Sequence, residues 1–244
     1  ETAPNFVTAT GGAITTSGNF KIHTFNSSGD FVVSHAGIPA GSTAVDYLVV
    51  AGGGGNGNAG SGGGAGGFRE SSGAASGCYT RSPLGSGVSA ITVSKQTYAV
   101  VIGAGGSAGA KGSNTVALGI TSTGGGNGGD RPGGGGSGGS GGGASDYSTS
   151  PGGTGNDPPT SPPQGNPGGS GSSGENGGGG GGALSAGGNA SGVPGTGATT
   201  QITGSAVLYA SGGAGDGASP APGPAQPRAN TGDGSSTAAV GSGP

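Results

Sequence analysis

Residues 124–143 read GGGNGGDRPGGGGSGGSGGG, a stretch in which no side chain is large enough to build a hydrophobic core. The same composition recurs along the chain, because 70 of its 244 residues are glycine. A conventional layered domain needs far more apolar surface than such a sequence supplies. Collagen is also excluded, because it requires glycine at every third position and residues 221–230 (APGPAQPRAN) break that period. The fold therefore depends on the hydrogen bonds that the glycine backbone can form.

Six glycine-rich blocks alternate with segments that carry larger side chains. Between residues 124 and 200 the only large apolar side chains are Tyr147, Leu184 and Val193. Their burial returns only a few kcal/mol, which cannot offset the conformational entropy lost when the whole region is ordered. Backbone hydrogen bonds must therefore hold this region if it is ordered. The six blocks are residues 52–67, 103–112, 124–129, 133–143, 177–182 and 211–217.

The polyglycine-II helix meets this requirement. It has three residues per turn, rises about 3.1 Å per residue and makes no internal hydrogen bonds. Its N–H and C=O groups point outward, so rods that lie side by side can satisfy one another. Glycine is needed at the packed positions because a Cβ would hold neighbouring backbones apart. We predict an ordered bundle of such rods; the alternative is a flexible glycine-rich linker.

Short β-strands are predicted where β-branched and aromatic residues gather. Residues 19–25 (NFKIHTF) alternate, with Phe20 and Ile22 on one face. No window shows a sustained helical period, so we predict essentially no α-helix. The expected fold is mainly β, with a β-strand region at residues 1–51 and a polyglycine-II bundle at residues 52–244, in one compact unit. The predicted strands are residues 19–25, 30–34, 44–51, 89–102, 115–121 and 201–209.

Bulk composition excludes several classes of function. The formal net charge is −3 and the seven basic residues are scattered, which argues against binding to nucleic acid. The longest apolar run, residues 47–51, is too short to insert into a membrane. Cys78 is the only cysteine, so neither an intrachain disulfide nor a cysteine-based metal cage can form. The chain contains no methionine, so we expect Glu1 to follow processing or to lie within a longer protein.

Catalytic and cofactor motifs are weak. Matches to GxGxxG are expected by chance at this glycine content, and no lysine lies between a glycine and a Ser or Thr, as a phosphate-binding loop requires. The two histidines, His23 and His35, and Cys78 lack the sequence context of a catalytic group. Asp130, Asp146 and Asp157 do not have the spacing of a calcium loop. We predict no enzyme activity, no cofactor and no metal site, although an ion shared between loops stays open.

The segments between the blocks are the remaining candidates for function. Tyrosine and arginine are enriched where binding energy concentrates, and loops held by a rigid scaffold are common recognition sites. We therefore predict that these segments bind a receptor; the alternative is that they are solvated turns that only connect rods. The candidate receptor-binding residues are Tyr79, Arg81, Asp130, Arg131, Asp146, Tyr147 and Arg228.

The order of motifs along the chain resembles the glycine-rich domain of bacteriophage tail-fibre and related virion proteins. The first motifs are VTATGGAITTS at residues 7–17 and NFKIHTF, followed by VDYLVVAGGGG at residues 45–55. GGGAGGFRES at residues 62–71 and ITGSAVLYASGGAGDG at residues 202–217 continue the series. More distantly, the plan is similar to the adhesins that cap the long tail fibres of T-even-like phages.

This resemblance implies a non-enzymatic virion or extracellular protein, in which a polyglycine-II sandwich displays variable loops to a bacterial cell-surface receptor. A larger fibre or copies of the same chain are further expected partners, without nucleic acid or membrane insertion. The family pattern usually closes with an apolar strand, whereas residues 241–244 read GSGP. A neighbouring chain could supply that strand, so the alternative function is a self-assembling subunit of an extracellular or virion-surface filament. Ice binding by a flat bundle is a minor third possibility.

Overall fold

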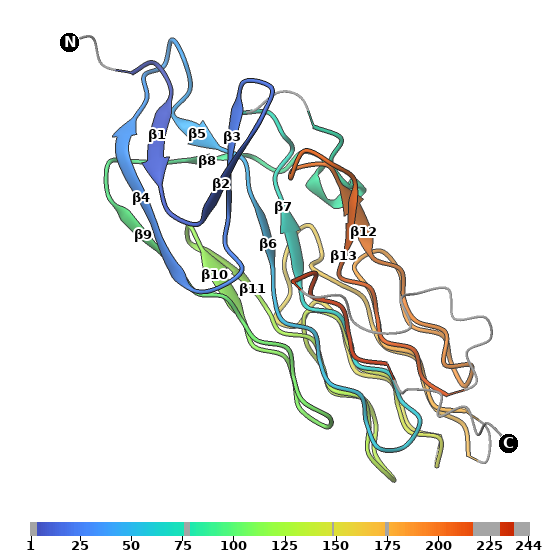
Figure 1. Cartoon of the computed structure of the whole chain (residues 1–244). Coiled ribbons are helices and arrows are strands. Elements are labelled where there is room, and N and C mark those ends of the chain that lie inside the picture. The colour runs from blue at the N-terminus through green and yellow to red at the C-terminus, as the bar shows by residue number, and fades with distance from the viewer. Residues whose placement is uncertain (1–3, 76–78, 148, 174–175, 217–229, 237–244) are drawn as a thin grey trace, which may run out of the picture.

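The computed structural model describes residues 4–75, 79–147, 149–173, 176–216 and 230–236. These residues form short β-strands, one 3-10 helix and long glycine segments, and they contain no α-helix, as predicted (Figure 1). No helix among them is long and apolar enough to cross a membrane. The elements are β1 (Val7–Thr10), β2 (Ala13–Ser17), β3 (Phe20–Thr24), β4 (Gly29–Ala36), β5 (Ala44–Val45), β6 (Leu48–Val50), β7 (Phe68–Glu70), η1 (Pro83–Gly85), β8 (Ile91–Thr92), β9 (Thr97–Val100), β10 (Thr115–Ala117), β11 (Ile120–Ser122), β12 (Ala198–Thr200) and β13 (Val207–Tyr209).

The strands pair antiparallel in small sheets at one end of the molecule (Figure 1). The largest sheet has three strands in the order β1-β4-β9, and β2 forms a hairpin with β3. Phe31 and Val33 alternate toward the inside of β4, where they pack with Val93 and Val100. This cluster is one of two small cores in the described part of the chain; the other surrounds Phe68. The remaining two-stranded sheets pair β5 with β8, β6 with β7, β10 with β11 and β12 with β13.

The strand predictions were correct in place, but most were too long, and the one at residues 30–34 was too short because β4 spans Gly29–Ala36. The strand expected at residues 44–51 is interrupted at Asp46 and Tyr47, because the Ser71 side chain accepts a hydrogen bond from the Tyr47 N–H and donates one to Asp46. The segment at residues 89–102 likewise splits into β8 and β9, and only β13 forms within residues 201–209. We did not predict β1, β2, β7 or β12. β7 and β12 are three-residue strands beside glycine blocks, which carry no periodic signal.

The hydrogen bonds of residues 62–67 repeat every three residues. Successive backbone N–H groups donate to three different segments, and the next three residues return to the same segments in the same order. This is the pattern of a helix with three residues per turn and no internal bonds, which identifies the polyglycine-II rod. The donors Gly62, Gly63 and Gly64 bond to the carbonyls of Gly178, Ser235 and Gly126, and Ala65, Gly66 and Gly67 bond to those of Gly181, Gly232 and Thr123, at 2.7–3.1 Å.

The carbonyl groups of the same rod bind three further segments. The backbone N–H groups of Gly54, Ser140 and Gly213 donate to the carbonyls of Gly64, Ala65 and Gly63 at 2.8, 2.9 and 2.8 Å, respectively. The rod therefore has six neighbours, three that accept from it and three that donate to it. Six neighbours around one rod define hexagonal packing, in which backbone groups rather than side chains make the contacts.

The rods run side by side away from the sheets (Figure 1). Two glycine blocks each contain more than one rod. Residues 52–67 turn back on themselves where the Gly57 N–H donates to the Ser61 carbonyl at 3.1 Å. Residues 133–143 likewise fold back, with the Gly142 N–H bound to the Gly136 carbonyl at 2.9 Å. Antiparallel neighbours are therefore made within a block as well as between blocks.

Glycine is required in the interior of the bundle because neighbouring backbones occupy the space of a side chain. A Cβ at Gly63 would lie 2.1 Å from the Gly54 carbonyl oxygen, and one at Gly180 would lie 1.9 Å from the Gly63 carbonyl oxygen. Gly105, on an exposed rod, differs because a Cβ there would meet only the Gly53 carbonyl oxygen, at 3.7 Å. The position of a glycine in the bundle, and not its presence alone, therefore decides how much it matters.

We predict that Gly63→Ala destabilises the protein while Gly105→Ala does not. Insertion of one methyl group into a closed backbone contact costs about 1–3 kcal/mol or more, which lowers the melting temperature of a chain of this size by about 5 °C or more. Thermal unfolding followed by circular dichroism measures both variants. Equal melting temperatures for the two variants would contradict the packing described above.

Candidate functional site

Two loops and a turn meet at the end of the bundle away from the strands. β6 leads into the first rod and β7 follows the second, so the turn between these rods, at residues 58–60, lies at that end. The Asn58 N–H donates to Asp130 Oδ1 at 2.8 Å, and the Asp146 N–H donates to the Ala59 carbonyl at 3.1 Å. The turn therefore holds two sequence-distant loops, and we call the resulting surface the tip.

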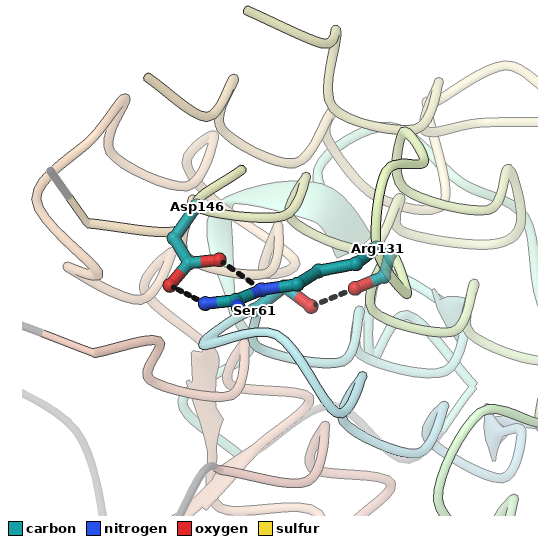
Figure 2. A network of polar contacts seen from close by, with 4 residues as sticks. Ser61, Arg131 and Asp146 are labelled. Atoms are coloured by element: carbon teal, nitrogen blue, oxygen red, sulfur yellow. Dashed lines mark hydrogen bonds and ion pairs between the residues drawn. The ribbon is translucent and has the colours of Figure 1, made fainter. Parts of the chain in front are cut away.

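Arg131 and Asp146 form a two-pronged ion pair at the tip (Figure 2). Arg131 Nε donates to Asp146 Oδ1 at 3.1 Å and Nη2 donates to Oδ2 at 2.9 Å. This hydrogen bonding, followed by the carboxylate's charge, raises the pKa of Arg131. The side chain of Arg131 is 57% exposed, so the pair holds an arginine in place without removing it from solvent. The neighbouring Ser61 hydroxyl donates to the Gly129 carbonyl at 2.7 Å (Figure 2).

Tyr147 stands beside this ion pair. The guanidinium carbon of Arg131 lies 5.5 Å from the centre of the Tyr147 ring, within the range of a cation–π contact. Tyr147 is 59% exposed, so an aromatic ring and a fixed guanidinium share one accessible surface. Asp216 reaches the same end, because its N–H donates to the Gly60 carbonyl at 2.8 Å. Asp130 and Asp216 therefore belong to the same end of the bundle, but of the described carboxylates only that of Asp146 pairs with Arg131.

The loop that carries Asp146 and Tyr147 is shorter than the sequence suggested. The display segment was expected to begin at residue 144, but Ala144 and Ser145 are fully buried and remain part of the rod. Their N–H groups donate to the Gly169 carbonyl at 2.9 Å and to the Gly133 carbonyl at 3.2 Å. Asp146 is the first residue whose side chain leaves the bundle, because small side chains alone fit between rods.

Tyr79 and Arg81 lie near η1, at the other end of the bundle. The ends are separated by the length of the rod at residues 61–67, and the distance is about 30 Å when the flanking residues are included. The Tyr79 hydroxyl donates to the Ser71 carbonyl at 3.0 Å, and burial raises its pKa. Arg81 is exposed and lines a shallow depression with Thr80, Ser82, Pro83 and Ser86. These two residues therefore do not share a surface with the tip.

Glu70, which was not among the candidate site residues, fixes the loop that carries Arg81. Glu70 is 2% exposed. Its Oε2 accepts hydrogen bonds from the Ser82 N–H at 2.9 Å and hydroxyl at 2.5 Å, and its Oε1 accepts one from the Thr200 hydroxyl at 2.5 Å. The carboxylate joins β7, the loop before η1 and β12. No sequence signal could have found it, because Thr200 lies 130 residues away.

The other chemistry-bearing residues make structural contacts where they are described. His23 Nδ1 lies 2.8 Å from the Gly11 carbonyl, and its ring packs edge-on against Phe31 at 5.2 Å. The described part of the chain contains no group of three or more His, Cys, Asp or Glu that could hold a metal ion. Cys78 and the predicted receptor-binding residue Arg228 lie outside the described residues.

Family comparison agrees with the glycine architecture. A family model described as a glycine-rich domain matches residues 26–244. The chain therefore belongs to this glycine-rich domain family. Searches of curated proteins and of solved structures gave no match.

We predict that Glu70→Gln lowers the free energy of unfolding by about 2 kcal/mol, because an amide cannot accept from all three donors and hydrogen bonds to charged groups contribute about 1.5–3 kcal/mol. Asp146→Asn is the matched control. It should cost less than about 1 kcal/mol, since its ion pair involves an exposed arginine. Urea unfolding measures both, and a larger loss in Asp146→Asn than in Glu70→Gln would refute this ranking.

Proposed function

We propose that the protein is a non-enzymatic recognition module of the phage tail-fibre or adhesin type, which binds a bacterial cell-surface receptor through its tip. The single observation that carries the proposal is the cluster of Arg131, Asp146 and Tyr147. An exposed arginine is held by a carboxylate beside an exposed tyrosine, although two separate loops supply these residues. Exposed Arg and Tyr held close together are typical of the residues that dominate binding energy.

The bundle supports this proposal through its rigidity. Each loop leaves a rod whose backbone is bound to neighbouring rods, and the turn at residues 58–60 binds both loops. Side chains that are already ordered lose less entropy when they bind a partner. Gly60 in the turn is itself closely packed, but the side chains of Arg131 and Tyr147 are exposed, so they can change without entering a packed contact. A module with these properties can vary its tip while it keeps its fold.

The resemblance of the motifs to tail-fibre domains supplies the proposed location and partner. It favours a virion or extracellular setting, a bacterial receptor and attachment to a larger fibre. In this setting the tip at one end of the rods would face the receptor. Tyr79 is a weaker candidate for a receptor contact than Tyr147, because its hydroxyl is already bound to Ser71. Arg81 is exposed and defines a second surface that the test must separate from the tip.

A filament subunit is the second candidate function, and the outermost described rod favours it. Along residues 104–108, the backbone N–H groups of Ala104, Gly105, Ser107 and Ala108 have no hydrogen-bond partner within the described ranges of the chain. A rod from a second copy could extend the hexagonal packing there. Lys111 is exposed on the adjoining segment, and a charge on an edge opposes such pairing. We therefore place this function second.

The proposal is tested by binding of the protein, fused to a fluorescent protein, to a panel of bacterial strains in flow cytometry. On a strain that binds the fusion, Arg131→Ala and Tyr147→Ala should each weaken binding by about 10-fold or more, since a hot-spot residue contributes over 1 kcal/mol. Arg81→Ala at the opposite end is the matched control and should leave binding unchanged. The melting temperatures of all three variants should stay within about 3 °C of the parent.

Two outcomes would overturn the proposal. Binding that depends on Arg81 but not on Arg131 or Tyr147 would show that the receptor-binding surface lies at the opposite end of the bundle. Absence of binding to every strain, together with regular filaments of the purified protein in electron microscopy, would favour the structural subunit.

A further inference from the structure

A depression of about 420 Å³ lies among the N-terminal strands, outside the tip and the Arg81 surface. It is formed where the connection between β1 and β2 meets the connection between β3 and β4. Its size falls in the range of small-molecule sites and accommodates one sugar ring. The residues that supply its chemistry are Gly11, Gly12, Phe25, Asn26, Ser27 and Asp30.

The polar side chains of this depression are free to bind a ligand. Asp30 and Asn26 are exposed, and neither side chain makes a hydrogen bond or ion pair within the described part of the chain. Ser27 also keeps a free hydroxyl among these residues, whereas the Ser28 hydroxyl accepts a hydrogen bond from the Ile102 N–H at 3.0 Å. Residues that carry an amide, a hydroxyl and a carboxylate thus line one small volume, and each of these groups can bind a ligand hydroxyl group.

The rim of the depression is already ordered. His23 Nδ1 lies at hydrogen-bond distance, 2.8 Å, from the Gly11 carbonyl oxygen, and the His23 ring packs against Phe31 of the core. Phe25 lies against the two glycines, since a Cβ at Gly12 would sit 3.1 Å from the edge of its ring. Gly11 has a φ of 112°, and a Cβ there would lie 2.0 Å from the Asp30 carbonyl oxygen. Side chains are therefore excluded from this rim, and half-buried Phe25 supplies its apolar surface.

The charge of the depression selects the class of ligand. Asp30 is the only charged residue that lines it, so it lacks the cation that a phosphate or an acidic sugar would need. A single carboxylate is also too little for a calcium ion, which takes six to eight oxygen ligands. A neutral polyhydroxylated ligand fits this depression, because it needs neither a cation nor several carboxylates. Its hydroxyl groups can donate to Asp30 and exchange hydrogen bonds with Asn26 and Ser27, while its C–H face packs against Phe25.

We propose that this depression is a binding site for a neutral sugar, with Asp30 as the main hydrogen-bond acceptor and Phe25 as the apolar platform. The site lies among the N-terminal strands rather than at the tip, so it goes beyond the proposed receptor-binding function and does not depend on it. A site with three free polar groups and one half-buried ring corresponds to weak binding, with Kd in the millimolar range, or about −4 kcal/mol.

The test is a nuclear magnetic resonance titration of the full chain with the methyl glycosides of glucose, galactose and mannose. We expect at least one of them to shift the amide signals of residues 11–13 and 24–30 in a saturable manner. Asp30→Asn should weaken binding by about 10-fold, the effect of losing a hydrogen bond to a charged acceptor. Asp157→Asn is the matched control, because Asp157 is also exposed and lies outside the depression.

Three results would overturn the proposal. The first is that none of the three glycosides produces saturable shifts at these residues. The second is that the shifts persist unchanged in Asp30→Asn. The third is that calcium chloride or inorganic phosphate, added alone, shifts the same signals while the glycosides do not, which would assign the depression to an ion.

Discussion

The backbone hydrogen bond between neighbouring glycine rods is the interaction on which the rest of the structure depends. Each such bond contributes only about 1 kcal/mol net, but the central rod makes them to six neighbours along its length. They form only because backbones approach closely enough to exclude a Cβ, as at Gly63 and Gly180. The side-chain cores around Phe31 and around Phe68 are small by comparison and lie toward the strands.

This constraint also explains where chemically active side chains can occur. In the described rods, fully buried positions such as Ala65 and Ser140 carry small side chains, and the larger buried Asp233 is accommodated because it accepts a hydrogen bond from the Ser211 N–H. Most larger side chains therefore lie in turns, strands and outer edges. The tip with Arg131 and Tyr147 and the depression with Asp30 both lie outside the packed rods for this reason. Scaffold and binding surfaces are thus separated along the chain, which allows each proposed site to be altered with little effect on the fold.

The sequence was sufficient to predict the class of fold. A helix with three residues per turn and no internal hydrogen bonds lets glycine backbones pack side by side and bond to one another. The sequence could not predict how many rods a block contains, since the turn at residues 58–60 looks like the blocks around it. It identified Asp130, Arg131, Asp146 and Tyr147 as candidate residues but not that they meet. Their proximity, like the bond between Glu70 and Thr200, depends on the lateral order of rods, which carries no local signal.

Native-state hydrogen exchange, followed residue by residue, tests the central claim most directly. The account predicts that the amides of residues 62–67 all exchange slowly, although these residues have almost no side chains to bury. The exposed amides of Ala104, Gly105, Ser107 and Ala108 should exchange faster by a factor of about 1,000 or more, equivalent to about 4 kcal/mol of opening free energy. Rapid exchange throughout residues 62–67 would contradict a bundle held together by its backbone.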